Sequence, residues 1–196
     1  MVKLSIGKIS KDFGFALMKL GLNVAKPQLT ENVYWALNSA IEDSKLSSEI
    51  TQRYAILVDE LSKLIQQKCK STTVWCWDGK YYYVSLEDWK KIINKDTLDR
   101  MKWLAEYHDC DNFATQFSAY VDIFFQINSA GIAIGEVLDK NNRVIGYHAW
   151  NCLIVQENDK AEVYFYEPQG DILKKVESCI VNMDWAKYSA DIIIFK

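Results

Sequence analysis

The chain has 196 residues, of which 49% are hydrophobic and 25% charged, and its formal net charge is −3. This length suits one domain, and the composition excludes a long disordered tail. The negative charge disfavours a nucleic-acid partner. No stretch approaches the roughly eighteen uncharged apolar residues of a membrane span, and lysines interrupt the N-terminal stretch where a signal peptide would be apolar. We therefore expect a folded cytoplasmic protein without a membrane partner, although a virion protein would look the same.

The first part of the chain is predicted to be helical. Thr30 is a good N-cap for one helix, and residues 48–68 carry apolar side chains at helical spacing, which predicts a second helix. The pattern changes near residues 70–72. We therefore divide the chain into a helical N-terminal region, residues 1–70, and a core, residues 71–196, within one continuous globule.

From residue 72 onward, the spacing of the apolar residues changes from that of a helix to that of a strand. Residues 72–85 are β-branched and aromatic on both sides of Asp78-Gly79, which predicts a hairpin because both turn residues favour positive φ. Ser85 with Asp88 is a capping-box variant that starts a short helix ending near Asn94. Residues 97–106 are predicted to form another helix.

The last part of the chain is predicted to be a helix followed by strands. The helix begins at Asp109 or Cys110 and is followed by strands joined by asparagine-containing turns. Together with the earlier helices, this order indicates an α+β fold. The predicted elements after the helix are strands at 132–138, 144–155 and 161–167, a helix near 181–188 and a terminal strand at 191–195.

Three polar side chains at the ends of these elements suggest thiol chemistry. Cys110 lies in the first turn of a predicted helix, where free N–H groups and the helix dipole favour a thiolate. His148 begins a strand, and Glu167 ends the neighbouring strand, so the two side chains can meet at one edge of the sheet. We predict Cys110 as nucleophile, His148 as base and acid, and Glu167 as the residue that orients the ring. The alternative is a core cysteine, a core histidine and a surface carboxylate.

The residues around the cysteine allow a metal site. Asp109, Asp111 and Asn112 offer the oxygen atoms that calcium prefers, although acidic residues at a helix start usually serve as caps. The five cysteines include no C-x-x-C pair, which argues against a zinc ribbon or a regular disulfide framework. We expect reduced thiols and no required cofactor, with calcium as the only metal considered.

The motifs Asp-Cys-Asp-Asn-Phe-Ala (109–114), Gly-Tyr-His-Ala-Trp-Asn (146–151) and Glu-Pro-Gln (167–169) resemble the papain-like cysteine peptidase superfamily. Within it they are most similar to the C-terminal peptidase domain of a mushroom (Marasmius-type) agglutinin, and more loosely to transglutaminase-like domains. The resemblance runs from about residue 97 to the end of the chain. It implies a papain-like core, with the nucleophile helix packed on an antiparallel sheet, and some dependence on calcium.

The resemblance also implies supporting residues around the three named above. Asn151 and Gln169 lie beside the motifs and are candidates for supporting hydrogen bonds. The glutamine that papain relatives place before the nucleophile is replaced by Leu104 here, so the second oxyanion donor is open between Trp103, Tyr107 and His108.

The predicted function is therefore a cysteine hydrolase, a peptidase or amidase that forms an acyl-enzyme with a peptide or protein substrate. Two alternatives remain at this point. One is a transglutaminase-like acyltransferase, which passes the acyl group to an amine. The other is a non-catalytic binding or structural protein, of viral origin among other sources, on the same fold. The sequence leaves the oligomeric state open.

Overall fold

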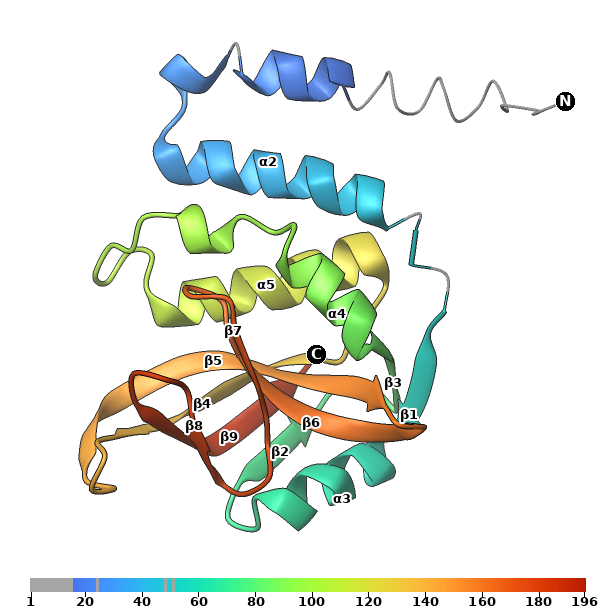
Figure 1. The fold of residues 1–196 in the computed structure, drawn as a ribbon, viewed down its shortest axis with the longest axis vertical. Coiled ribbons are helices and arrows are strands. Elements are labelled where there is room, and N and C mark those ends of the chain that lie inside the picture. Colours follow the sequence, from blue (N-terminus) through green and yellow to red (C-terminus); the bar gives the residue numbers. More distant parts are fainter. Residues whose placement is uncertain (1–15, 24, 48, 51) are drawn as a thin grey trace, which may run out of the picture.

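The computed structural model describes residues 16–23, 25–47, 49–50 and 52–196, so part of the predicted N-terminal region lies outside the described residues. Most of the described helices lie on one side of a curled sheet, and the helix at residues 58–68 lies on the other (Figure 1). The chain is helical at residues 16–23, and short 3-10 turns lie at Lys26–Gln28 and Leu98–Arg100. The α-helices that follow are α2 (Glu31–Leu46), α3 (Val58–Lys68), α4 (Leu86–Ile93) and α5 (Cys110–Phe125).

Within the described residues, nine strands join in one mixed sheet whose main path runs β1-β3-β5-β4-β9-β2. Strand β6 pairs with β5 and β7, and β8 pairs with β9. Most pairs are antiparallel, but β3 pairs with β5, and β2 with β9, in parallel. The strands are β1 (Tyr54–Leu57), β2 (Thr73–Cys76), β3 (Lys80–Ser85), β4 (Ala130–Leu138), β5 (Val144–Glu157), β6 (Lys160–Glu167), β7 (Ile172–Lys175), β8 (Ile180–Asn182) and β9 (Lys187–Phe195).

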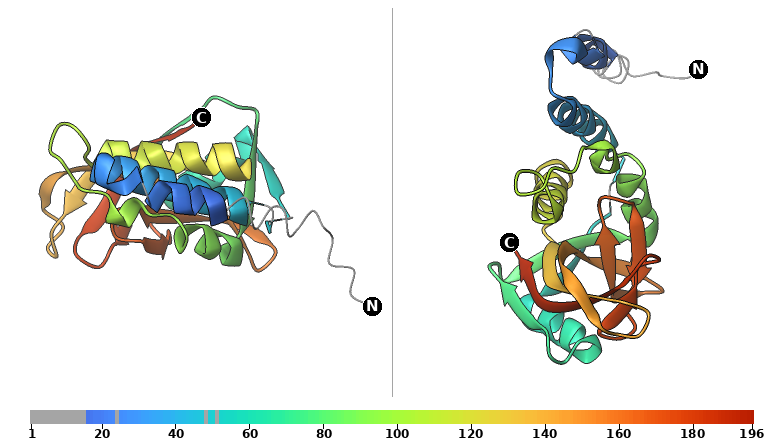
Figure 2. Two further views of the ribbon diagram at one scale, coloured as in Figure 1. Left: turned by 90° about the horizontal axis from the view of Figure 1, so that it is seen from above. Right: turned by 90° about the vertical axis from the view of Figure 1, so that its left-hand side faces the viewer.

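Residues 149–155 of the central strand β5 are buried on both faces, because helices cover this part of the sheet on either side (Figures 1 and 2). Side chains such as Leu153 and Val155 belong to a core with α4 and α5. The alternate side chains Trp150, Cys152 and Ile154 belong to a second core that includes α3. This explains the continuous apolar run in β5, which a strand with one solvent-exposed face would not show.

Helix α2 covers the outer side of α5, opposite the sheet (Figure 2). Leu46, at the end of α2, shares a core with Phe113 and Phe117 of α5. The side chain of Thr97 also donates a hydrogen bond of 2.6 Å to the carbonyl oxygen of Trp35. Helix α2 therefore packs directly on the helix that begins with Cys110.

The predicted hairpin through Asp78-Gly79 is wrong. Strands β2 and β3 do form on either side of it, but β2 pairs with β9, while β3 pairs with β1 and β5. Gly79 does not have a positive φ, so the connection is not the primed turn that a two-residue hairpin requires. Strands that are distant in the sequence decide this pairing. The residues on either side of Asp78-Gly79 do not indicate which strands these are.

Three predicted helices are also corrected. The stretch 48–68 contains strand β1 before α3, so residues 54–68 belong with the sheet and not with a purely helical N-terminal region. The stretch 97–106 contains only the short turn at Leu98–Arg100, and the stretch 181–188 holds β8, a turn and the start of β9. The first and last of these stretches have apolar residues compatible with either period, and pairing with the sheet favours strand β1 in one and strands β8 and β9 in the other.

The predictions that rest on local chemistry are confirmed. The hydroxyl of Ser85 accepts a hydrogen bond of 3.1 Å from the backbone of Asp88 and caps α4. Asn142 has a φ of 61°, and Asn158 and Asp159 have φ values of 48° and 61°, as tight turns between strands require. Helix α5 begins at Cys110.

The fold class needs correction at the level of the sheet. An antiparallel sheet in a papain-like core was expected, whereas the structure has a mixed and strongly curled sheet with two parallel pairs (Figure 1). Strand β7, which was not predicted, adds to one side of it through β6. In the part of the chain that the structure describes, no helix is both long and apolar enough to cross a lipid bilayer.

Candidate functional site

Cys110 is the first residue of α5, and its position follows from the cap of that helix. The backbone N–H of Asp109 donates to the side-chain oxygen of Asn112 at 3.1 Å, and Asp109 in turn accepts from the backbone of Glu106 at 3.2 Å. These contacts fix the turn that leads into the helix. The thiol of Cys110 consequently lies at the positive end of the helix dipole, which stabilises a thiolate.

Strands β5 and β6 place a histidine beside a buried glutamate. His148 lies on β5, and Glu167 is the last residue of β6, which pairs with β5. The Nε2 atom of His148 is 2.6 Å from Oε2 of Glu167, whose side chain is almost completely buried. Because Nε2 is engaged with the carboxylate, the other ring nitrogen is left for the thiol.

Two further donors hold the carboxylate of Glu167. The hydroxyl of Tyr188 donates to Oε2 at 2.8 Å, and the backbone N–H of Gln169 donates to Oε1 at 3.1 Å. A buried carboxylate is costly unless it is paired and hydrogen-bonded, and both conditions are met here. Glu167 is therefore kept in one orientation toward the ring of His148.

The thiol and the imidazole interact directly. A hydrogen bond to His148 is the main cause that lowers the pKa of Cys110, and the backbone N–H of Ala149 contributes, while burial opposes the shift. Burial also opposes protonation of His148, but hydrogen bonds with Cys110 and Glu167 outweigh it and raise the pKa of the ring to about 9. Both shifts favour a thiolate beside an imidazolium near neutral pH.

The remaining cysteines lack this environment. Burial raises the pKa of Cys69 to about 12, and it also raises the pKa values of Cys76 and Cys152. Cys110 is half-buried rather than enclosed. A partly accessible thiolate with a proton donor beside it is a nucleophile, and the donor can protonate whatever group its attack releases.

The structure thus brings Cys110, His148 and Glu167 together, as the sequence predicted. It separates Asn151 from this group: the side-chain amide of Asn151 is fully buried and donates to the carbonyl oxygens of Ala114 and Gly131, so it ties α5 to β4. This role is structural.

The two other supporting candidates differ from each other. Gln169 contacts Glu167 through its backbone, and its side-chain Nε2 is buried without a protein partner. Trp103 is 54% exposed, and within the described residues no hydrogen bond or ring contact connects it with Cys110 or His148. Gln169 therefore adjoins the site, whereas the role suggested for Trp103 as an oxyanion donor stays a prediction.

Two aromatic residues at the site were missed by the sequence analysis. Tyr188 holds Glu167, and the ring of Trp185 lies edge-on to His148, with centroids 6.4 Å apart, while 61% exposed. Both fall in the stretch that was assigned to a helix. Recognition of β9 as a strand that pairs with β4 would have been needed to place them.

The acidic residues beside the thiol form a small cluster. Asp109, Cys110 and Asp111 have possible metal-ligating atoms within 4.8 Å of one another. A hydrogen bond between the two carboxyl groups lowers the pKa of Asp109 and raises that of Asp111. The side-chain oxygen of Asn112 already accepts the capping hydrogen bond. Two carboxyl groups are thus left for a hard cation.

His108 lies close to the cysteine in sequence but is turned elsewhere. Its Nε2 is 3.2 Å from the side-chain oxygen of Gln116, and its ring packs edge-on to Phe113 with centroids 4.5 Å apart. His108 therefore supports the first turns of α5 and does not act as the base for Cys110.

Comparison with known proteins places this geometry in a family. The model of the ricin-type beta-trefoil lectin C-terminal domain matches residues 35–182. A solved structure described as a PSL1a–E64 complex is similar over 72% of this chain, with a TM-score of 0.55 and 21% identity. A structure of Polyporus squamosus lectin bound to a sialylated epitope, Neu5Aca2-6Galb1-4GlcNAc, is similar over 72%, with a TM-score of 0.53 and 20% identity. No curated protein matches.

The chain spans only about half of the length of these structures, namely 51% and 49% of their chains. At this level of identity the likeness concerns the fold. The ligands named for these structures are properties of those longer proteins.

These comparisons correct the assignment made from the sequence. The resemblance to papain-like cysteine peptidases rested on three short motifs, whereas the family model extends over residues 35–182 and describes a lectin domain. The predictions of an enzyme, of a thiol peptidase or amidase, and of a peptide or protein substrate are contradicted on the same ground, because the family model and one of the similar structures are described as lectins. The family description names no cofactor. The chain belongs to the family of the ricin-type beta-trefoil lectin C-terminal domain.

Proposed function

We propose that this chain is a binding domain whose ligand site is formed by Cys110, His148 and Glu167. One observation supports this proposal above all: His148 hydrogen-bonds a carboxylate on one side and a half-buried thiol on the other, so that the pKa of the thiol falls. Stability alone does not require such an arrangement, since an apolar side chain would fill the same space at lower cost. Shifted groups of this kind gather at functional sites.

The chemistry of the site suits ligands with an electrophilic carbon. E64, the compound named for one of the similar structures, carries an epoxide. The thiolate of Cys110 would form a bond to one epoxide carbon while the carbon–oxygen bond of the ring breaks. The alkoxide released by this step would take the proton from the imidazolium of His148. This proton transfer completes the addition, and the reaction needs no further reagent.

Intact-mass analysis after incubation with E64 at pH 6 tests the proposal. We expect one E64 per chain, located on Cys110 by peptide mapping, and none on the Cys110→Ala variant. Cys179→Ala is the matched control, because that thiol is also partly accessible, and it should be labelled as the wild type is. Labelling that is spread over several cysteines, or that persists in Cys110→Ala, would refute the assigned site.

Carbohydrate binding is a second candidate, favoured by the family and by Trp185. Its ring is 61% exposed and lies against His148, where the flat face of a sugar could pack on it. Titration calorimetry with the sialylated trisaccharide named for the similar lectin gives a direct test. Binding that Trp185→Ala weakens at least 10-fold would support this candidate. An absence of binding by the folded wild type would exclude that glycan as the ligand.

We also propose that calcium, when present, is held by Asp109 and Asp111. Two carboxylates with ligating atoms within 4.8 Å of each other fit a hard cation, which prefers oxygen ligands. Millimolar calcium should then raise the Tm of the wild type by a few degrees and leave that of Asp111→Asn unchanged. An equal shift in both proteins, or none in either, would exclude this site.

All five cysteines are free, which supports a reducing compartment such as the cytoplasm.

A further inference from the structure

A second pair of cysteines lies far from Cys110, where the end of α3 meets the loop between β7 and β8. Cys69 is the C-cap of α3, and Cys179 immediately precedes β8. The thiol of Cys179 donates to the carbonyl oxygen of Lys68 at 3.3 Å, one residue before Cys69. About 110 residues separate the two cysteines in the sequence, so the fold itself brings them together.

The two cysteines belong to the same apolar core. Cys69 is 1% exposed and belongs to the core formed with β5, β6 and β9, and Cys179 packs against the same core. Burial and then the nearby Cys179 raise the pKa of Cys69. Cys179 is the more accessible member of the pair.

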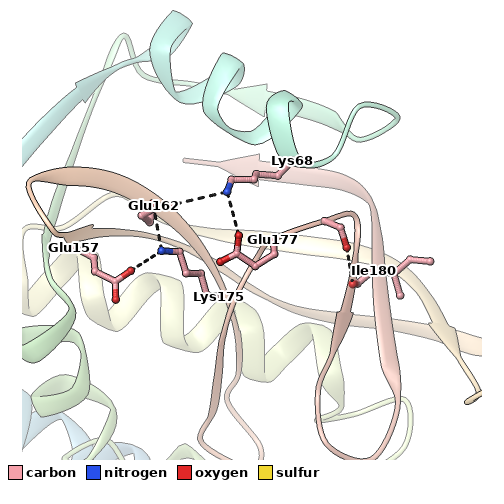
Figure 3. A network of polar contacts seen from close by, with 7 residues as sticks. Lys68, Glu157, Glu162, Lys175, Glu177 and Ile180 are labelled. Atoms are coloured by element: carbon pink, nitrogen blue, oxygen red, sulfur yellow. Dashed lines mark hydrogen bonds and ion pairs between the residues drawn. The ribbon is translucent and has the colours of Figure 1, made fainter.

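A surface recess gives access to the thiol of Cys179. It has a volume of about 430 Å³, and Lys68, Lys70, Ser71, Ser178 and Ile180 also line it. Lys68 is anchored by ion pairs with Glu162 and Glu177, at 3.9 and 3.6 Å, and its network continues to Lys175 and Glu157 (Figure 3). Lysine side chains at the recess would attract an anionic disulfide.

We propose that Cys69 and Cys179 form a reversible disulfide, with a glutathione-type disulfide as the oxidant. The thiolate of Cys179 attacks one sulfur of the oxidant, and one glutathione thiolate leaves. The thiol of Cys69 loses its proton and attacks the mixed disulfide at Cys179, which releases the second glutathione. The two cysteines lose two electrons and two protons in total, and the oxidant becomes two molecules of reduced glutathione.

The bond would fasten the β7–β8 loop to the end of α3. It would close a loop of about 110 residues, and long loops gain most from closure in the chain-entropy description. We therefore expect the oxidised protein to unfold at a Tm roughly 5 to 10 °C above that of the reduced protein. This pair could not be recognised from the sequence, because the two cysteines do not form a motif with characteristic spacing.

Oxidation in the Cys110→Ala background tests the pair without interference from the ligand site. After treatment with oxidised glutathione, we expect loss of two free thiols, a mass decrease of two hydrogen atoms, and a peptide that links Cys69 with Cys179. Dithiothreitol should reverse all three changes and the shift in Tm.

Two variants complete the test in the same background. Cys76→Ala should behave like its parent, whereas Cys179→Ser should form no bond and show no shift in Tm. A bond from Cys69 to Cys152, which also lies near it, would overturn the proposal. So would a stable glutathione adduct on Cys179 without a second step. Either result leaves the ligand site at Cys110 unaffected.

Discussion

At the scale of single residues, the site depends on the thiolate of Cys110 and the imidazolium of His148, which stabilise each other. Cys110 lies at a helix N-terminus, but its largest stabilising contact is His148, and the ring in turn depends on Glu167. The sequence revealed these three residues because each is a polar group at the end of an apolar element. It did not reveal Tyr188, whose contribution depends on which strands are neighbours.

Replacement of His148 by Ala should slow alkylation of Cys110 at low pH. Without the ring, the pKa of the thiol returns toward 9, its ordinary value, so less thiolate is present at pH 6. We expect iodoacetamide to react with Cys110 at least about 10-fold more slowly at pH 6 than in the wild type. The difference should shrink at pH 9.5, where both proteins carry a thiolate. Equal rates at pH 6 would show that the ring does not activate the thiol.

The Glu167→Gln variant should lie between the wild type and His148→Ala. The amide keeps the shape of the side chain but removes the charge that raises the pKa of His148, so the imidazolium is lost at a lower pH. The alkylation profile of Cys110 should therefore extend less far toward acid pH than in the wild type. A profile identical to that of the wild type would mean that Glu167 has no electrostatic effect on the ring.

At the scale of secondary structure, the turns and the helix caps could be predicted from local residues. The positions of several strands depend on long-range pairing and could not. Asn142, Asn158 and Asp159 occupy tight turns because such residues tolerate positive φ, which is a local property. Strand β2 lies beside β9, more than a hundred residues later, and no local pattern specifies that neighbour. The helix predicted near 181–188 failed for the same reason, since pairing with β4 makes β9 a strand.

Gly135 illustrates how closely β4 and β9 approach at an irregularity in their register. A Cβ atom at Gly135 would lie 2.0 Å from the backbone oxygen of Ser189, which is impossible without displacement of β9. Gly135→Ala should lower the free energy of unfolding by about 2 to 4 kcal/mol in urea denaturation. Gly146→Ala is the control on the neighbouring strand, where a Cβ meets nothing within 4 Å and the loss should stay below about 0.5 kcal/mol. Equal losses would contradict this description of the packing.

At the scale of the whole molecule, helix α2 and the sheet share one core through α5. Leu46 and Ile50 pack in the same core as Leu153 and Tyr166 of the sheet. The family could not be predicted from three short motifs. Its model depends on the pattern of residues 35–182, much of which has no catalytic or binding chemistry.

This shared core predicts that the chain unfolds as one unit. Circular dichroism and tryptophan fluorescence should report a single transition with the same midpoint, since a single cooperative unit loses helix and sheet together. Trp35 on α2 and Trp150 on β5 serve as reporters from the two halves. Two separate transitions would show that the helical region and the sheet are independent domains.

The central claim is that the ring of His148 is an imidazolium near neutral pH, and this can be measured directly. The chain has only two histidines, so an NMR titration of the ring signals, assigned with a His108→Gln variant, follows His148 individually. We predict a pKa raised from 6.5 to about 9, and a fall toward the ordinary value in Cys110→Ala, because a hydrogen bond with the cysteine helps to raise it. A ring of His148 that titrates near 6.5 in both proteins would contradict the thiolate–imidazolium pair.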